Sequence, residues 1–210
     1  MIFTLQNGLG NEQFLAEHFG AERILGGLCF ICLARIKPGV IELYDNGQLA
    51  LGEFSGFPQP RLHDLAWEFK CYGIVCSVVA GLALEHRYKL VWNIPFNGLA
   101  VAAGGIDIDK ILSDAGLRPL AVELMDETIT IANRCGHNLP TAVALDQIKR
   151  TETMENYKPS TLLDYLAGGP MEIEAVWGEP LRRGREAGPA ILRLEMLYRL
   201  LVSLNRSRRK

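Results

Sequence analysis

The sequence predicts a small α/β segment at the N-terminus followed by an all-α domain, so that the chain is mostly helical overall. Strand and turn patterns dominate as far as about residue 80, and helical apolar spacing dominates after it. The 210 residues, 49% of them hydrophobic, are enough for one large or two small domains with a buried core. We expect the boundary near residue 70, between segments 1–70 and 71–210.

The first predicted unit is a strand, a turn and a helix. Phe3–Gln6 has the character of a short strand that stops at the turn Asn7-Gly-Leu-Gly10. Asn11 then opens a helix that runs to about Phe19. Ile24–Leu33 follows as a strand apolar enough to be buried on both faces.

A hairpin is predicted next. Asp45-Asn-Gly47 lies between the strand-like segments Val40–Tyr44 and Gln48–Phe54, which is typical of a type I′ turn. Leu62–Lys70 has helical periodicity, and Ile74–Val79 is a short apolar strand.

The rest of the chain is predicted to be helical. Asp107 suits the start of a short helix, and Ser160 is a plausible N-cap. The acidic side chains Glu123, Asp126 and Glu127 are expected to face solvent. The helical stretches are 87–103, a short helix after 107, 118–135, a helix end within 146–155, 160–167, 172–186 and 191–204.

Composition argues against several classes of function. A net charge of −2 gives no reason to expect nucleic acid or an anionic membrane as partner. Five cysteines and too few residues before Gln6 for a secretory leader favour reduced thiols in a cytoplasmic protein. Cys29-Phe-Ile-Cys32 lies in an apolar run without a second cysteine pair, so no metal site is predicted. The apolar run Cys71–Leu84 is too short to span a bilayer.

One helix carries a polar row on an apolar background. Lys89, Asn93 and Asn97 recur at steps of four, which places them on one slanting line, and Pro95 interrupts the helix within that line. Such a row forms either a solvated helix face or a pocket that binds and protonates an oxygen-rich substrate. Spacing alone leaves both interpretations open.

Three motifs carry a resemblance to a known family. Tyr88–Asn97 resembles the Lys-x-x-x-Asn-x-x-x-Asn signature of ketopantoate reductases (2-dehydropantoate 2-reductases). Lys158–Asp164, followed by Glu172-Ile-Glu174, resembles the second signature of that family, and Gln6–Asn11 resembles a turn of its dinucleotide-binding domain. The resemblance runs from about residue 3 to residue 204.

The resemblance implies a partial Rossmann-like segment and an all-α substrate and dimerisation domain. It implies reduction of 2-dehydropantoate, a small 2-keto acid, to (R)-pantoate with NADPH, a step towards pantothenate and coenzyme A. Lys89 matches the general acid, a role that requires a lysine pKa drawn towards neutrality. The matching substrate-binding residues are Asn93, Asn97, Ser160 and Asn7, and the matching cofactor-binding residues are Asn7, Glu172 and Cys32.

Two departures from the family pattern bear on function. Tyr157 stands where many members carry an asparagine, which weakens the assignment of ketopantoate itself as the substrate but not the resemblance to the family. The fingerprint Gly-x-Gly-x-x-Gly does not occur, and Gly8-Leu-Gly10 corresponds to a later turn. We therefore expect the first part of the nucleotide domain to be missing, so that NADPH binding by the chain alone is incomplete.

A partial sheet of this kind would expose apolar strand edges. We expect compensation by a homodimer, by exchanged elements or by a separate N-terminal piece. The alternatives to a ketopantoate reductase are a catalytically silent helical dimerisation remnant and a related 2-keto acid reductase with a different substrate.

Overall fold

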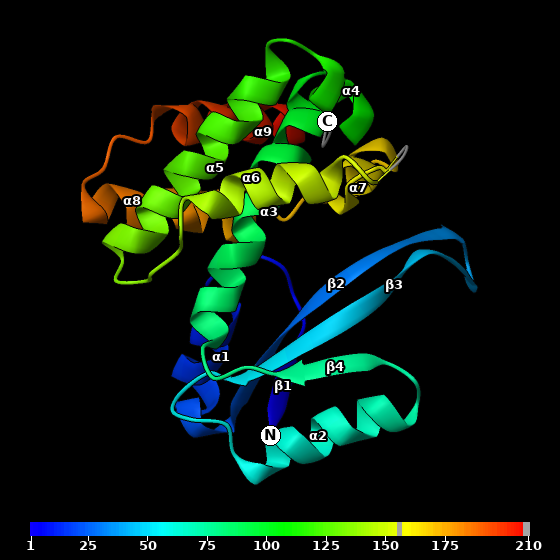
Figure 1. Cartoon of the computed structure of the whole chain (residues 1–210), viewed down its shortest axis with the longest axis vertical. Coiled ribbons are helices and arrows are strands. Elements are labelled where there is room, and N and C mark those ends of the chain that lie inside the picture. Colours follow the sequence, from blue (N-terminus) through cyan, green and yellow to red (C-terminus); the bar gives the residue numbers. More distant parts are fainter. Residues whose placement is uncertain (155–156, 208–210) are drawn as a thin grey trace. The chain divides into compact units, whose positions relative to one another are not determined.

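The computed structural model describes residues 1–154 and 157–207, without the side chains of residues 32, 34–36 and 44–46. A small sheet is followed by helices, which confirms the predicted fold class (Figure 1). The chain divides into two compact units, Met1–His86 and Arg87–Lys210. The boundary expected near residue 70 therefore lies inside the first unit, at the end of a helix.

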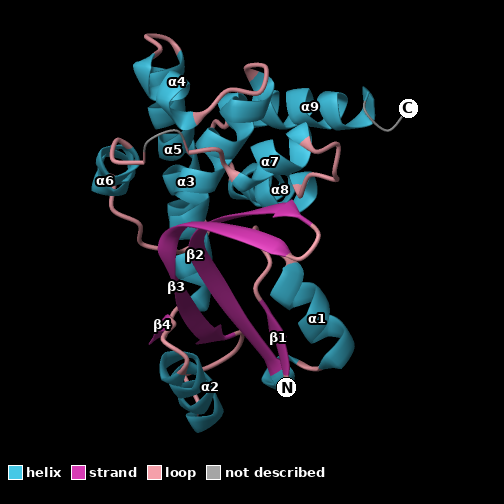
Figure 2. Cartoon of the chain, turned by 90° about the vertical axis from the view of Figure 1, so that its right-hand side faces the viewer, coloured by secondary structure: helices cyan, strands magenta, loops and turns pink. Residues whose placement is uncertain are grey.

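The first unit is a four-stranded sheet with two longer helices (Figure 2). Its strands follow the order β1-β2-β3-β4, with β1 parallel to β2, β2 antiparallel to β3, and β3 parallel to β4. The elements are β1 (Ile2–Thr4), α1 (Asn11–Phe19), η1 (Ala21–Arg23), β2 (Ile24–Lys37), β3 (Val40–Glu53), α2 (Pro60–Cys71) and β4 (Val75–Val78).

The hairpin predicted at Asp45-Asn-Gly47 is wrong. Strand β3 runs through this segment, and the chain reverses between Lys37 and Val40 instead. The register shifts where Phe30 pairs with Gln48 and Cys32 pairs with Asp45, so β3 uses one more residue than β2 there. The turn-like sequence therefore forms a bulge, a feature that Asn and Gly also permit.

Strand β2 is buried over only part of its length. Ile24, Leu25 and Leu28 are buried, whereas Ile31 and Leu33 are 41% and 42% exposed. The expectation that Ile24–Leu33 is buried on both faces therefore fails in its second half. That half belongs to a two-stranded ribbon, because β1 pairs with β2 at residues 24–26 alone (Figure 1).

The two faces of the sheet pack on different helices. On one face Leu25 and Leu51 form a core with Leu62 and Ala66 of α2. On the other face Leu28 and Ala50 contact Leu82, at the start of the long helix α3 (Leu82–Ala102). Gly26 and Gly52 make this contact possible, since a Cβ on either would lie 2.5–2.7 Å from the Leu82 side chain.

The second unit contains the rest of α3 and the helices that pack around it. Residues 93–101 of α3 are all buried, which makes this stretch the centre of the helical core. The other elements are α4 (Ile108–Ser113), α5 (Leu117–Arg134), α6 (Ala142–Thr151), α7 (Ser160–Leu166), the π-helical turn η2 (Glu174–Gly178), α8 (Glu179–Ala187) and α9 (Leu192–Ser207). None of the helices in the described ranges has the length and apolar character needed to cross a membrane.

Two helix starts test the capping predictions. Asp107 caps α4 by accepting a hydrogen bond from the Lys110 amide at 3.1 Å, as expected. At α7 the extended Pro159 occupies the cap position and Ser160 is the first helical residue, so the prediction of a Ser160 cap is wrong.

The prediction that Glu127 faces solvent is also wrong. Its side chain is buried, and its carboxylate accepts hydrogen bonds from the Arg193 amide at 3.2 Å and the Leu194 amide at 2.9 Å. These amides belong to the first turn of α9, where main-chain N–H groups lack helical partners. Glu127 therefore fixes the start of α9 on α5, a role that periodicity cannot reveal.

Candidate functional site

The polar row on α3 lies largely in the interior of the second unit. Asn93 is 7% exposed, Asn97 is 2% exposed and Lys89 is half-buried. A solvated helix face is therefore excluded for the two asparagines. Burying a carboxamide costs free energy unless its polar atoms are bonded, so these side chains must serve contacts of the fold or of a ligand.

Pro95 lies between the two asparagines. It has no N–H group, so the Val91 carbonyl loses the hydrogen bond that a helix would normally give it. Val91 and Pro95 are both buried. The main chain of this turn therefore depends more on contacts with neighbouring elements than a regular helix would.

Asn97 connects α3 to the start of α7. Its Oδ1 accepts a hydrogen bond from the Thr161 amide at 3.0 Å, and Thr161 is buried. The preceding residue, Ser160, is exposed. The structure thus brings Ser160 and Asn97, two residues predicted from separate motifs, to the same end of α7.

Glu172 is exposed and precedes the π-helical turn η2. Its carbonyl accepts a hydrogen bond from the Val176 amide at 3.1 Å. In the same turn the fully buried Trp177 donates its Nε1–H to the Ile94 carbonyl of α3 at 3.0 Å. The segment after Glu172 is therefore attached to α3 between the two asparagines.

The remaining predicted residues belong to the first unit. Asn7 is half-buried and its carbonyl accepts a hydrogen bond from Asn11 Nδ2 at 2.9 Å. The turn that it begins contains Gly8 and Gly10 with φ of 89° and 94°, which suits glycine and leads directly into α1. Cys32 lies in β2, but its side chain falls outside the part of the chain that the structure describes.

Three basic side chains of the second unit, Arg87, His137 and Arg183, lie close enough to affect one another electrostatically. Burial lowers the pKa of Arg87, and the nearby Arg183 lowers it further. Burial likewise lowers the pKa of His137, with Arg87 and Arg183 adding to the effect. This part of the unit therefore favours anionic neighbours.

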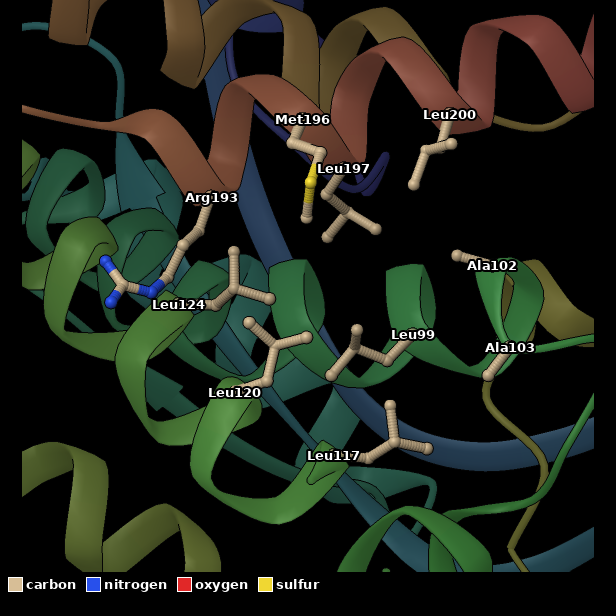
Figure 3. A pocket seen from close by; sticks show the side chains of 10 residues that line it. All are labelled: Leu99, Ala102, Ala103, Leu117, Leu120, Leu124, Arg193, Met196, Leu197 and Leu200. Carbon is tan, nitrogen blue, oxygen red and sulfur yellow. The ribbon is translucent and has the colours of Figure 1, made fainter.

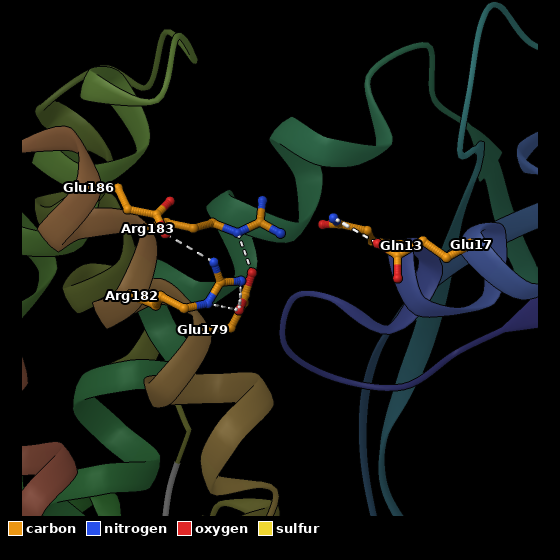
Figure 4. A network of polar contacts seen from close by, with 6 residues as sticks. All are labelled: Gln13, Glu17, Glu179, Arg182, Arg183 and Glu186. Atoms are coloured by element: carbon orange, nitrogen blue, oxygen red, sulfur yellow. Dashed lines mark hydrogen bonds and ion pairs between the residues drawn. The ribbon is translucent and has the colours of Figure 1, made fainter.

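Glu179 supplies one such neighbour. Its carboxylate accepts hydrogen bonds from Arg183 Nε at 2.7 Å and from Arg182, which also pairs with Glu186 at 3.2 Å (Figure 4). Burial raises the pKa of Glu179, but the hydrogen bonds from Arg183 and Arg182 outweigh burial, so the net shift is downward. Among the described residues, His, Cys, Asp and Glu side chains form no cluster of three that could hold a metal ion.

A separate cavity of about 180 Å³ lies between α3, α5 and α9 (Figure 3). Of its lining residues, Arg193 alone is charged, and none belongs to the predicted site. Its lining consists of Leu99, Ala102, Ala103, Leu117, Leu120, Leu124, Arg193, Met196, Leu197 and Leu200. The cavity is therefore not the polar site that the α3 row predicts.

Sequence reasoning missed Trp177. A signal was present in Gly98, a glycine inside a helix of otherwise larger residues, which often marks close approach of another group. A Cβ at Gly98 would lie 2.6 Å from the Leu197 side chain and 3.0 Å from Trp177 Nε1. The partner itself could not be identified without the fold.

Two family models match the chain. The one described as "Ketopantoate reductase PanE/ApbA C terminal" matches residues 82–205, and the one described as "Ketopantoate reductase PanE/ApbA" matches residues 1–56. Together they cover both units on either side of α2.

Individual relatives agree with the family models. A 2-dehydropantoate 2-reductase of Nostoc sp. is 34% identical over 210 residues, which cover 98% of this chain and 66% of the relative. The crystal structure of 2-dehydropantoate 2-reductase from Geobacter metallireducens has a TM-score of 0.93 and 40% identity, covering 97% of this chain and 68% of that one. The enzyme from Methylococcus capsulatus has a TM-score of 0.92 and 34% identity, covering 100% and 67%.

The chain thus spans about two thirds of the length of these relatives. More distant structures share the fold alone; they include D-mandelate dehydrogenase with NADH, at 19% identity, and a dimeric ketopantoate reductase from Staphylococcus aureus, at 20%. The ranges matched by the two family models include the α3 row and the turn at Asn7. The chain belongs to the ketopantoate reductase family.

Proposed function

We propose that the chain takes part in the NADPH-dependent reduction of 2-dehydropantoate to (R)-pantoate. The observation that carries this proposal is the α3 row, in which Asn93 and Asn97 are buried polar groups on the helix that bears the half-buried Lys89. Buried carboxamides of this kind suit recognition of a small, oxygen-rich 2-keto acid.

Lys89 is proposed as the proton donor. A bound nicotinamide cofactor would supply the hydride for the carbonyl carbon of the substrate. The Lys89 ammonium would then give a proton to the carbonyl oxygen, to which the π-electrons move, and would become a neutral amine. Asn93, Asn97, Ser160 and Asn7 are proposed to bind the substrate, and the exposed hydroxyl of Ser160 suits its carboxylate.

Some residues of this chain suit contacts with a nicotinamide cofactor, whereas the turn that would bind its pyrophosphate does not occur in the sequence. Asn7, Glu172 and Cys32 are proposed to contact the cofactor. The turn with Gly8 and Gly10 at positive φ supports this assignment, because it lets the main chain approach a ligand closely. The sequence has no Gly-x-Gly-x-x-Gly turn for the pyrophosphate. We infer a homodimer with exchanged elements in the cytoplasm as the assembly of this chain. Because a second copy has the same sequence, this assembly would cover the sheet edges but would not supply the pyrophosphate turn.

A related 2-keto acid reductase with another substrate is the second candidate. Tyr157 favours it, because this aromatic residue lies three positions before Ser160 in place of the asparagine that the family resemblance implies. A catalytically silent helical dimerisation remnant is the non-enzymatic alternative.

Calorimetric titration of the purified chain with NADPH, with and without ketopantoate, tests the proposal. Micromolar binding, together with oxidation of NADPH on addition of ketopantoate, is the expected result. The same assay with other 2-keto acids distinguishes the second candidate. Absence of binding at millimolar NADPH would show that this chain alone is not a reductase.

A further inference from the structure

We infer that Trp177 is a positioning residue of the site: it holds the α3 turn that bears Asn93 and Asn97 in register with the segment that bears Glu172. This inference rests on the proposed function, because it concerns the geometry of the same residues. It assigns a role to a side chain outside the predicted site.

The contact of Trp177 with α3 is specific in direction and place. The indole is 0% exposed, and its Nε1–H donates to the Ile94 carbonyl at 3.0 Å. Ile94 lies between Asn93 and Asn97 and directly before Pro95. Pro95 removes one main-chain hydrogen bond from this turn of α3. The hydrogen bond from Trp177, which lies outside α3, therefore has more influence on the position of the turn.

Gly98 shows that the contact depends on close approach. A Cβ there would lie 3.0 Å from Trp177 Nε1 and 2.6 Å from the Leu197 side chain. Any larger residue would push the indole or α9 away from the helix. Because Gly98 has no side chain, the Trp177 indole can reach the Ile94 carbonyl.

The other end of the contact is the turn that follows Glu172. Trp177 belongs to the π-helical turn η2, which is also bonded to α9 through Tyr198 Oη and Glu174 Oε1 at 2.9 Å. Single π-helical turns occur often at functional sites, where they aim a segment in a direction that a regular helix does not allow. With one end on α9 and the other on α3, this turn determines where Glu172 lies.

Two buried contacts therefore link the predicted residues of the second unit into one frame. Trp177 joins the Glu172 segment to α3, and Asn97 joins α3 to the Thr161 amide beside Ser160. Displacement of reacting groups by about 1 Å can cost on the order of 100-fold in rate. A loosened Trp177 contact should therefore affect catalysis more than it affects folding.

Trp177→Phe removes the N–H donor and keeps most of the ring. The matched control is Trp92→Phe, because Trp92 also lies in this unit and donates its N–H, but to Thr151 Oγ1 of α6 at 2.9 Å. Both variants lose one indole hydrogen bond, and we expect similar decreases in melting temperature. We expect Trp177→Phe to lower kcat for the 2-keto acid about tenfold with little change in KM for NADPH, and Trp92→Phe to retain the parent kcat.

Side-chain amide NMR of protein labelled at asparagine gives a second readout that does not need turnover. We expect the Asn93 and Asn97 amides to lose order, seen as a reduced heteronuclear NOE, in Trp177→Phe and to keep it in Trp92→Phe. Equal behaviour of the two variants in both measurements would overturn the inference. If the parent chain shows no turnover with any 2-keto acid, the proposed function fails, and the amide measurement still decides whether Trp177 positions the row.

Discussion

In the helical unit two buried polar side chains accept hydrogen bonds from main-chain amides of other helices, and one of them, Glu127, also pairs with Arg193 Nη1 at 3.3 Å. In the sheet unit two buried acids pair with basic side chains. Asn97 and Glu127 accept from amides of α7 and α9. In the first unit Glu12 pairs with His86 at 3.0 Å and Glu53 with Arg61. A bond to the main chain fixes one element against another, whereas a charged pair can be replaced as a pair. The helical unit is thus the one built to hold groups at defined positions.

The largest expected effect concerns chemistry in that unit. Lys89→Ala should lower turnover about 100- to 10,000-fold, because the developing alkoxide would lose its proton donor. Lys149→Ala, at an exposed position on α6, is the control for loss of a positive charge. Steady-state NADPH oxidation measures both, and full activity of Lys89→Ala would place the chemistry elsewhere.

Glu127 tests the role of main-chain bonding. Glu127→Leu should lower the free energy of unfolding by about 1–3 kcal/mol, because the buried Leu194 amide would lose its acceptor. Glu123→Leu removes an acid on the same helix whose side chain is 48% exposed and should cost less than about 1 kcal/mol. Urea unfolding compares them; equal losses would contradict the importance of the α9 amides.

The sheet unit should respond differently to substitution of a pair. Arg61→Met should lower the free energy of unfolding by about 1 kcal/mol, since Glu53, with a side chain only 2% exposed, would lose its charged partner. Adding Glu53→Met should recover most of that loss, because no buried charge would remain. If the double variant is less stable than the single one in urea unfolding, this part of the comparison is wrong.

The smallest effect is a pH dependence in the helical unit. Burial, Arg87 and Arg183 lower the pKa of His137 in the folded state below the ordinary value of 6.5. The unfolded chain therefore binds more protons as the pH falls below about 6.5, and stability decreases there. His137→Asn should flatten the decrease measured by thermal unfolding between about pH 7 and pH 5. An unchanged slope would show that other groups cause it.

Local patterns predicted the helices well because their causes lie within a few residues. The periodicity of α5, the Asp107 cap and the α3 row all depend on neighbours along one helix. The hairpin at Asp45-Asn-Gly47 failed because that signal also fits a bulge, and pairing with β2 along the whole of β3 decided between them. The exposure predicted for Glu127 was wrong, and the contact of Trp177 with α3 was missed, for a related reason. The partners of these residues lie 66 and 83 residues away in the sequence.

The family motifs supplied candidate site residues that periodicity could not, among them Ser160. They selected Asn97 and Ser160, which the structure places at the same end of α7. They could not show that one atom of Asn97 is already used by the fold. The bond from the Thr161 amide to Asn97 Oδ1 can be found only in the fold, where the start of α7 packs on α3.

The bond between Asn97 and Thr161 gives this carboxamide a polarity. A main-chain amide can only donate, so the atom facing it must be Oδ1, and the ambiguity of an asparagine flip is removed. If Asn97 binds the proposed substrate, its Nδ2 hydrogens are then the donors that it offers. A carbonyl or carboxylate oxygen satisfies them directly, whereas a hydroxyl must present its lone pair. In the proposed substrate site, Asn97 would therefore favour the acceptor oxygens of a 2-keto acid, although the second lone pair of its Oδ1 can still accept from a hydroxyl.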